Sequence, residues 1–191
     1  MNKQVWPYIV LTVFVALAFL LGNGLGKDSS ELKTVYENKP LPQFELPSLL
    51  RQGVLVGNEI FQGEWTVFNV WATWCSTCYI EHPYLLEMAA KGIVLVGLNY
   101  KDDDDAAREY LANYGNPFVE VLIDADGRTA LDLGVYGAPE TFLINPQGEV
   151  VLRRVGEINA RVWNEIFAPA ISEGGRTENT PETGPLEHND A

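Results

Sequence analysis

Two apolar runs of strand length constrain the fold of this chain more than any other feature. Thr66–Ala72 and Gly92–Asn99 are nearly continuous in hydrophobic residues, and a helical stretch from about Thr77 to Lys91 separates them. Segments that are apolar on both faces are typical of buried parallel strands, and parallel neighbours need a crossover connection. The pattern therefore predicts a βαβ unit.

Downstream segments extend this unit into a layered α/β domain. The turn sequence Asn145-Pro146-Gln147-Gly148 separates two apolar segments and indicates a β-hairpin. Its strands would add an antiparallel edge to a mostly parallel sheet, with helices on the faces. The other predicted elements are a helix over Asp103–Tyr114, a strand over Val119–Ile123, a short helix over Arg128–Leu133, hairpin strands over Thr141–Ile144 and Val150–Val155, and a closing helix over Arg161–Ile171.

The chain is long enough for one sizeable core, because 47% of its 191 residues are hydrophobic. We place this core domain at residues 43–171. Residues 27–42 are polar and then proline-bearing, which predicts a tether, and residues 172–191 have the composition of a disordered acidic tail. The formal net charge of -13 excludes nucleic acid as a partner, because its phosphates would be repelled.

An apolar run from Val5 to Leu21 dominates the N-terminus. A bilayer-spanning helix needs roughly 17–25 residues, whereas the apolar part of a cleavable signal peptide has about 7–15. We therefore predict an uncleaved membrane anchor over residues 1–26, with a cleaved signal peptide as the alternative. Lys3 favours a cytoplasmic N-terminus, which places the rest of the chain across the membrane.

The only two cysteines, Cys75 and Cys78, lie between a buried strand and the start of a helix. A helix N-terminus lowers the pKa of a thiol from about 8.5 to roughly 3.5–7.5, so Cys75 is expected to be the nucleophile. Cys78, one turn further on, is expected to be shielded and to act as the resolving thiol. A structural staple is an alternative, although a loop this short gives little stabilisation.

Metal and haem sites are disfavoured by the residues around the pair. A zinc site needs two more ligands, and the chain has only His82 and His188. Covalent haem attachment requires a histidine directly after the second cysteine, where this chain has Tyr79. No metal site is expected.

Two separated motifs resemble the thioredoxin superfamily. They are Val70–Cys78 (VWATWCSTC), followed by Pro83 in the helix, and Gly134–Phe142 (GVYGAPETF). The resemblance implies a thioredoxin-like fold: a central mixed sheet with a βαβ unit and a C-terminal hairpin, flanked by helices and here preceded by one transmembrane helix. It also implies that Pro139 follows a cis peptide bond beside the cysteines, so that the backbone of Ala138 can pair with an extended partner chain.

Within that superfamily, the second motif and the N-terminal anchor resemble the cytochrome c biogenesis group of thiol:disulfide interchange proteins, the CcmG/DsbE group. Asn69 stands where thioredoxins carry a buried aspartate that moves the proton of the resolving cysteine, so another base is needed. The resemblance points to Glu81 and Glu140, with solvated surface carboxylates as the alternative. Trp74 is expected to cover Cys75 and to contact the partner, and Trp71 to lie in the core.

The resemblance implies a reductant in the periplasm, anchored in a bacterial inner membrane. Its electrons would come from a membrane disulfide reductase of the DsbD/CcdA type and pass to the haem-binding cysteines of apocytochrome c, with no organic cofactor. One alternative is a DsbA-like oxidant or a general thiol:disulfide oxidoreductase, because few contacts decide the direction. The other is a membrane-tethered, non-enzymatic chaperone or scaffold.

Two weaker features complete the expectations. The acidic run Asp102–Asp105 lacks the spaced ligands and glycine of a calcium loop and is interpreted as a solvated helix start. His82 lies near the cysteines and is expected to be exposed.

Overall fold

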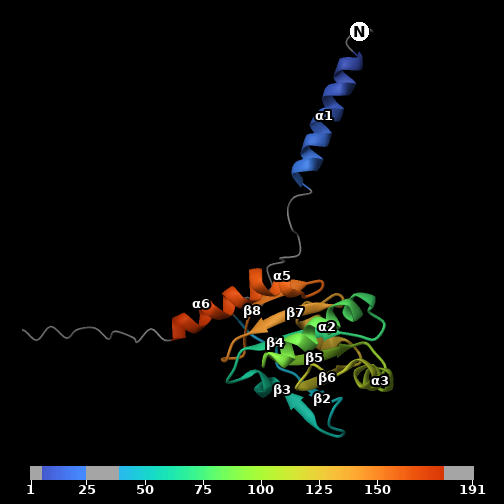
Figure 1. Cartoon of the computed structure of the whole chain (residues 1–191). Coiled ribbons are helices and arrows are strands. Elements are labelled where there is room, and N and C mark those ends of the chain that lie inside the picture. Colours follow the sequence, from blue (N-terminus) through green and yellow to red (C-terminus); the bar gives the residue numbers. More distant parts are fainter. Residues whose placement is uncertain (1–5, 25–38, 179–191) are drawn as a thin grey trace, which may run out of the picture. The chain divides into compact units, whose positions relative to one another are not determined.

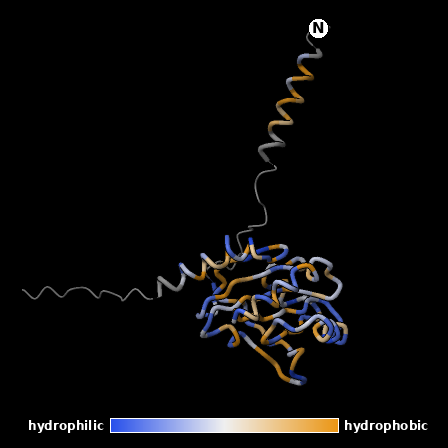
Figure 2. Tube along the Cα trace, viewed as in Figure 1, coloured by the Kyte–Doolittle hydropathy of each residue, from blue (hydrophilic) through white to orange (hydrophobic). Residues whose placement is uncertain are grey.

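The computed structural model describes residues 6–24 and 39–178, and the chain divides into two compact units, residues 1–31 and 32–191. The first unit contains helix α1 (Trp6–Gly24), whose residues are mostly hydrophobic by their hydropathy (Figure 2). Within the described ranges, no helix has the length and apolarity that crossing a membrane requires. The anchor predicted over residues 1–26 falls partly outside these ranges and stays a prediction.

A mixed sheet forms the centre of the second unit (Figure 1). Its strand order is β1-β8-β7-β4-β5-β6. The pairs β4–β5 and β5–β6 are parallel, and the pairs β4–β7, β7–β8 and β8–β1 are antiparallel. The predicted βαβ unit and hairpin are therefore confirmed. The strands are β1 (Lys39–Pro40), β4 (Thr66–Trp71), β5 (Val94–Tyr100), β6 (Glu120–Asp124), β7 (Glu140–Ile144) and β8 (Glu149–Val155).

Both faces of this sheet are covered, which explains the continuous apolar runs. In β4, Val67 and Trp71 pack on one face with residues of α2 and α3, while Phe68 and Val70 belong to a second core on the other face. The helices are α2 (Ser76–Ala90), α3 (Asp104–Tyr114), α4 (Arg128–Asp132), α5 (Ala160–Val162) and α6 (Ala168–Glu178), with the 3-10 helix η1 (Asn58–Phe61) and the π-helix η2 (Trp163–Phe167).

The domain begins earlier than the predicted boundary at residue 43. Lys39 and Pro40 pair with β8, and Leu41 is buried, so the end of the predicted tether belongs to the fold. A two-stranded hairpin of β2 (Glu45–Pro47) and β3 (Leu55–Gly57) was not predicted from the sequence. In Figure 1 it lies on the side of the unit away from α5 and α6.

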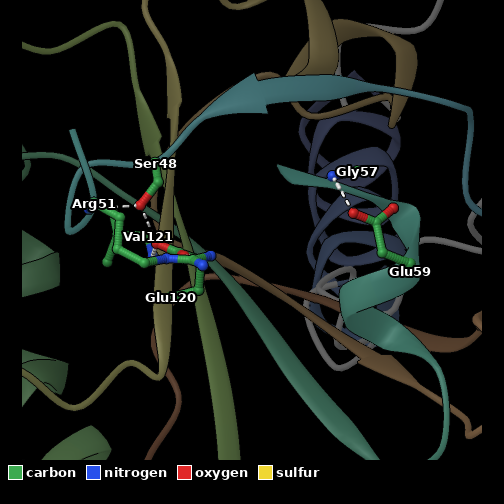
Figure 3. A network of polar contacts seen from close by, with 6 residues as sticks. All are labelled: Ser48, Arg51, Gly57, Glu59, Glu120 and Val121. Atoms are coloured by element: carbon green, nitrogen blue, oxygen red, sulfur yellow. Dashed lines mark hydrogen bonds and ion pairs between the residues drawn. The ribbon is translucent and has the colours of Figure 1, made fainter. Parts of the chain in front are cut away.

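A polar network joins this hairpin to β6 (Figure 3). Glu120 accepts hydrogen bonds from the Ser48 hydroxyl at 2.6 Å and from the Val121 N–H at 2.9 Å, and it pairs with Arg51. Burial acts to raise the pKa of Glu120, but these hydrogen bonds and the Arg51 charge outweigh it and hold the pKa below its ordinary value. Where β3 leads into η1, Glu59 of η1 accepts a hydrogen bond from the Gly57 N–H at 3.0 Å.

The closing helix runs further than predicted, so the boundary at Ser172 is wrong. The helical segment that Asn159 caps continues through η2 and α6 to Glu178. Gly174 allows the close approach to Trp65, because a Cβ there would lie 2.5 Å from the Trp65 ring. Gly174, which was assigned to the disordered tail by composition, therefore allows α6 to pack against Trp65. The rest of the predicted tail, residues 179–191, lies outside the described residues.

Candidate functional site

The two cysteines form a disulfide at the start of α2, at the carboxyl end of the central strand β4. Cys75 is the N-cap of α2, and its Sγ accepts a hydrogen bond from the Cys78 N–H at 3.1 Å. Both residues are buried in this disulfide state. The predicted position of Cys75 at a helix N-terminus is confirmed, and a sulfur anion there would face the unpaired N–H groups of the first turn.

The residues before the pair are anchored by the end of β4. The Trp71 ring is buried, 5.8 Å from the ring of Phe118 and 5.3 Å from that of Tyr110, as expected for a core residue. The chain then turns back, because the Cys75 N–H donates to the Ala72 carbonyl at 3.2 Å. This turn delivers Cys75 to the helix start.

Strand register brings the second motif to the cysteines. β7 runs antiparallel to β4, and Glu140 pairs with Val70 at the carboxyl end of β4. The Ala138–Pro139 peptide, which is cis as predicted, lies just beyond this pair and so at the level of the redox turn. The Pro139 carbonyl accepts a hydrogen bond from the Gly156 N–H at 2.9 Å.

Glu140 braces the loop that carries this cis peptide bond. Its carboxylate accepts hydrogen bonds from the Tyr136 N–H at 3.2 Å and from Arg153 Nε at 2.7 Å. Arg153 Nη2 also donates to the Gly134 carbonyl at 2.8 Å. Burial raises the pKa of Glu140 despite these partners. The alternative of a solvated surface carboxylate is therefore wrong for Glu140.

Glu81 is the second buried carboxylate of the site, with only 2% of its surface exposed. It accepts hydrogen bonds from Asn69 Nδ2 at 3.0 Å and from the Ile158 N–H at 2.9 Å. Burial raises its pKa to about 7, and these two donors oppose the rise only in part. The solvated alternative is wrong here too, because Glu81 follows Cys78 by one helical turn on the buried side of α2.

Asn69 links this carboxylate to β7. Its Nδ2 also donates to Thr141 Oγ1 at 3.1 Å, while its Oδ1 is buried without a hydrogen-bond partner. The amide therefore acts as a donor toward Glu81. In this arrangement the Glu81 carboxylate, one helical turn after Cys78, is the group that can take up a proton, and residue 69 is not.

Two expectations about neighbouring side chains meet different outcomes. Trp74 is 55% exposed and its indole N–H donates to the Lys101 carbonyl at 3.0 Å, so the ring is available to a partner. His82 is buried, with 5% of its surface exposed, and a ring nitrogen lies 3.0 Å from the Gly115 carbonyl. The expectation of an exposed His82 was wrong, because its helical spacing from Cys78 and Leu85 places it on the buried face. Burial lowers the pKa of His82.

Arg153, Thr141 and Ile158 belong to the site but were not found from the sequence. A signal existed for Arg153: in the predicted hairpin it pairs with Phe142, which makes it a diagonal neighbour of Glu140 on the same face. Ile158 contributes only its backbone N–H, which no residue pattern reveals. Among residues 6–24 and 39–178, no group of His, Cys, Asp and Glu side chains could hold a metal ion.

Comparisons with known proteins give a consistent result. The redoxin family matches residues 36–165. The thiol:disulfide interchange protein DsbE of Vibrio cholerae serotype O1 is 47% identical over 174 residues, 88% of this chain and 94% of that protein. The protein of the same name in Escherichia coli strain K12 is 45% identical over 167 residues, 84% and 90% of the two chains. The crystal structure of a candidate DsbE from Chlorobium tepidum has a TM-score of 0.61 at 29% identity, covering 72% of this chain and 96% of that one.

Proposed function

Since this chain belongs to the DsbE thiol:disulfide interchange proteins of the redoxin family, we propose that it reduces the haem-binding cysteines of apocytochrome c. The chain is a thiol:disulfide oxidoreductase whose redox group is the Cys75–Cys78 pair. The direction of electron flow and the substrate are the proposal. The observation that carries it is the 45–47% identity to proteins named DsbE over 84–88% of this chain, and the buried carboxylate of Glu81 one helical turn after Cys78 supports the exchange step itself.

The reaction moves two electrons from this chain to its substrate. The Cys75 thiolate attacks one sulfur of the substrate disulfide, which breaks that bond and forms a mixed disulfide. The Cys78 thiol then loses its proton and its sulfur attacks Cys75. The substrate leaves with both cysteines reduced, and this chain is left with the Cys75–Cys78 disulfide.

Proton transfer from Cys78 is what the buried carboxylate supports. A resolving thiol must become a thiolate before it can attack, and Glu81 with a pKa of about 7 can accept a proton at neutral pH. Glu140 is less suited, because it is paired with the positive charge of Arg153, which stabilises the ionised carboxylate, whereas the donors to Glu81 are uncharged. In the oxidising direction the same carboxyl group would return this proton to Cys78 as its sulfur leaves, so Glu81 supports the exchange in both directions. The reductant direction rests on the resemblance to the cytochrome c biogenesis group.

The cycle requires a donor that reduces the Cys75–Cys78 disulfide again. We assign this role to a membrane disulfide reductase of the DsbD/CcdA type. A donor thiolate is expected to attack Cys75, because Cys75 is the N-cap at the end of α2 and Cys78 lies within the first turn of the helix. No organic cofactor takes part in the exchange.

Substrate trapping tests the proposed function. A Cys78→Ser variant cannot resolve the mixed disulfide, so the substrate is expected to stay bonded to Cys75. Mass spectrometry after non-reducing purification should identify a captured chain with a Cys-x-x-Cys-His segment, released by dithiothreitol. The Cys75→Ser variant is the matched control and is expected to capture nothing. Captured chains that lack such a segment would contradict the cytochrome assignment while leaving the interchange activity intact.

We extend the proposal to the N-terminus, where residues 1–26 would anchor the chain in the inner membrane with the redox domain in the periplasm. The described side chains of α1 support this, because Ile9, Leu11, Val13 and Phe14 are all more than half exposed. Apolar surface of this extent is unfavourable in water and needs an apolar environment.

Cell fractionation tests the anchor. The full chain is expected in the membrane pellet after carbonate washing and in the soluble fraction only after detergent. The double variant Val13→Lys, Leu17→Lys should shift most of the protein to the soluble fraction, because a lysine at the centre of a membrane helix costs about 2.5–3.5 kcal/mol. Lysines at Thr180 and Thr183 are the matched control. Release of the unmodified chain by salt alone would disprove the anchor.

A further inference from the structure

Asp102, in the loop between β5 and α3, holds the backbone that leads into the redox turn. Its Oδ2 accepts a hydrogen bond from the Thr73 N–H at 2.6 Å, and its Oδ1 accepts one from Thr73 Oγ1 at 2.6 Å. Asn99 Nδ2 donates to the same carboxylate at 2.9 Å. Thr73 lies two residues before Cys75, so one side chain controls the arm on the N-terminal side of the redox pair.

The same loop also holds Trp74. The Lys101 carbonyl accepts the indole N–H of Trp74 at 3.0 Å, and the Trp74 ring lies 6.2 Å from that of Tyr100. Lys101 has a φ of 48°, the only positive φ at a non-glycine residue in the described part of the chain. Its N–H donates to the Asp124 carbonyl of β6 at 3.0 Å. The loop is therefore itself fixed to the sheet.

Asp102 is distinct from the acidic residues that follow it. Asp103 is the N-cap of α3, accepting from the Asp105 and Ala106 N–H groups, and Asp104 and Asp105 form ion pairs with Arg108. The solvated helix start expected for the acidic run describes these residues. It was wrong for Asp102, whose oxygens are turned toward Thr73 and Asn99.

We propose that Asp102 is a positioning residue for the interchange reaction, holding Thr73 and, through its loop, Trp74 so that Cys75 stays at the helix N-terminus in both redox states. The proposal rests on the thiol:disulfide exchange itself and not on the identity of the substrate. The carboxylate accepts from the Thr73 N–H, the Thr73 hydroxyl, Asn99 Nδ2 and the Asp103 N–H, and the single acceptor oxygen of an asparagine cannot serve all four donors. The Asn99 side chain is sensitive to this loss, because its Oδ1 is already without a hydrogen-bond partner.

The Asp102→Asn variant of the full chain tests this role against Asp104→Asn, which removes the same charge two residues away. With a synthetic disulfide-bonded peptide as substrate, Asp102→Asn is expected to lower kcat/KM about tenfold to a hundredfold, because small displacements of reacting groups have effects of this size. Part of the loss should appear as a higher KM, since the exposed Trp74 ring is expected to contact the partner. Asp104→Asn should match the wild type.

The acidity of the Cys75 thiol separates positioning from simple electrostatics. Removing a nearby negative charge would lower the thiol pKa, whereas a loosened helix start would raise it. Titration of thiolate absorbance should therefore give a higher pKa in Asp102→Asn than in Asp104→Asn. The proposal would be overturned by a lower Cys75 thiol pKa in Asp102→Asn than in Asp104→Asn. Equal values of the thiol pKa and of kcat/KM in the two variants would also overturn it.

Thr73 variants keep the test valid if Asp102→Asn does not fold. Thr73→Val removes the hydroxyl donor but retains the backbone N–H, so it should change kcat/KM and thiol pKa in the same direction by a smaller factor. Thr73→Ser retains both donors and should keep the wild-type values. Wild-type values of kcat/KM and thiol pKa in Thr73→Val would contradict the proposed contact.

Discussion

Replacing Glu81 with glutamine is expected to slow the resolution of the mixed disulfide by about 10²- to 10⁴-fold at pH 7.5, the usual contribution of a general base. Glutamine keeps the size of the side chain and can accept from the Ile158 N–H, but it cannot take up the Cys78 proton. In the wild type the rate should rise with pH through about 7, as Glu81 loses its own proton. Stopped-flow measurement of peptide release across pH 5–9 checks both results.

Glu87→Gln is the matched control, because Glu87 lies on the same helix, is exposed and pairs only loosely with Lys91, at 4.0 Å. Its rate and pH profile should equal those of the wild type. An unchanged rate in Glu81→Gln, with the inflection near pH 7 retained, would rule out Glu81 as the proton acceptor.

The Glu81→Gln variant also tests how the free energy of unfolding depends on pH, and the direction of this dependence can be predicted. The pKa of Glu81 is about 7 in the folded chain and about 4.5 in the unfolded chain, so between these values the folded state binds the extra proton. This group therefore contributes stability that is fully present below pH 4.5 and lost as the pH rises through about 7. The loss amounts to about 3 kcal/mol in the wild type and should be absent from Glu81→Gln. Urea unfolding of both proteins at pH 5 and pH 8 gives the difference.

The central layers of the fold could be predicted because their signals are local. The strands β4 and β5 are buried on both faces and so are continuous in apolar residues, and the turn at Asn145–Gly148 marks the hairpin. β1 and the β2–β3 hairpin have only two or three residues each, too few to establish a period of two. Their stability comes from contacts distant in sequence, such as Ser48 with Glu120, which no local pattern contains.

The reactive residues of the site could be predicted better than their burial and their hydrogen-bond partners. The motifs that contain Cys75, Cys78 and Pro139 can be identified from the spacing of their residues in the sequence, without any knowledge of packing. The burial of Glu81, by contrast, depends on Asn69 and on the backbone of Ile158, which come from β4 and from the segment before α5. The charge of Asp102 suggested a solvated side chain. Its hydrogen bond with Thr73 joins residues 29 apart in the chain, so no local pattern could reveal it.

Replacing Arg153 with methionine is expected to lower the free energy of unfolding by about 3–5 kcal/mol at pH 7.5, the usual cost of leaving one partner of a buried ion pair uncompensated. The pair qualifies because the side chains of Arg153 and Glu140 are only 7% and 1% exposed. Arg153 also holds the Gly134 carbonyl, so the cis-peptide loop should loosen and peptide exchange should slow. Urea unfolding and the exchange rate measure the two effects.

The pH dependence of this loss identifies its cause. Burial already raises the pKa of Glu140, and removal of Arg153 takes away a charge that lowers it, so the pKa should rise further in the variant. At pH 5 more of the Glu140 side chain is then protonated and neutral in the variant, and the loss of stability should shrink. Replacing both residues with methionine should recover most of the stability at pH 7.5, because no buried charge remains.

Arg161→Met serves as the control, because Arg161 is exposed and lies 3.7 Å from Glu165 in a surface pair of the kind worth about 0–1 kcal/mol. If Arg153→Met cost no more than this control, or if its cost were the same at pH 5 and pH 7.5, then the Glu140 charge would not be what Arg153 compensates. The hydrogen bonds that hold the cis-peptide loop would then be those of the Tyr136 and Gly137 N–H groups to Glu140 and that of the Pro139 carbonyl.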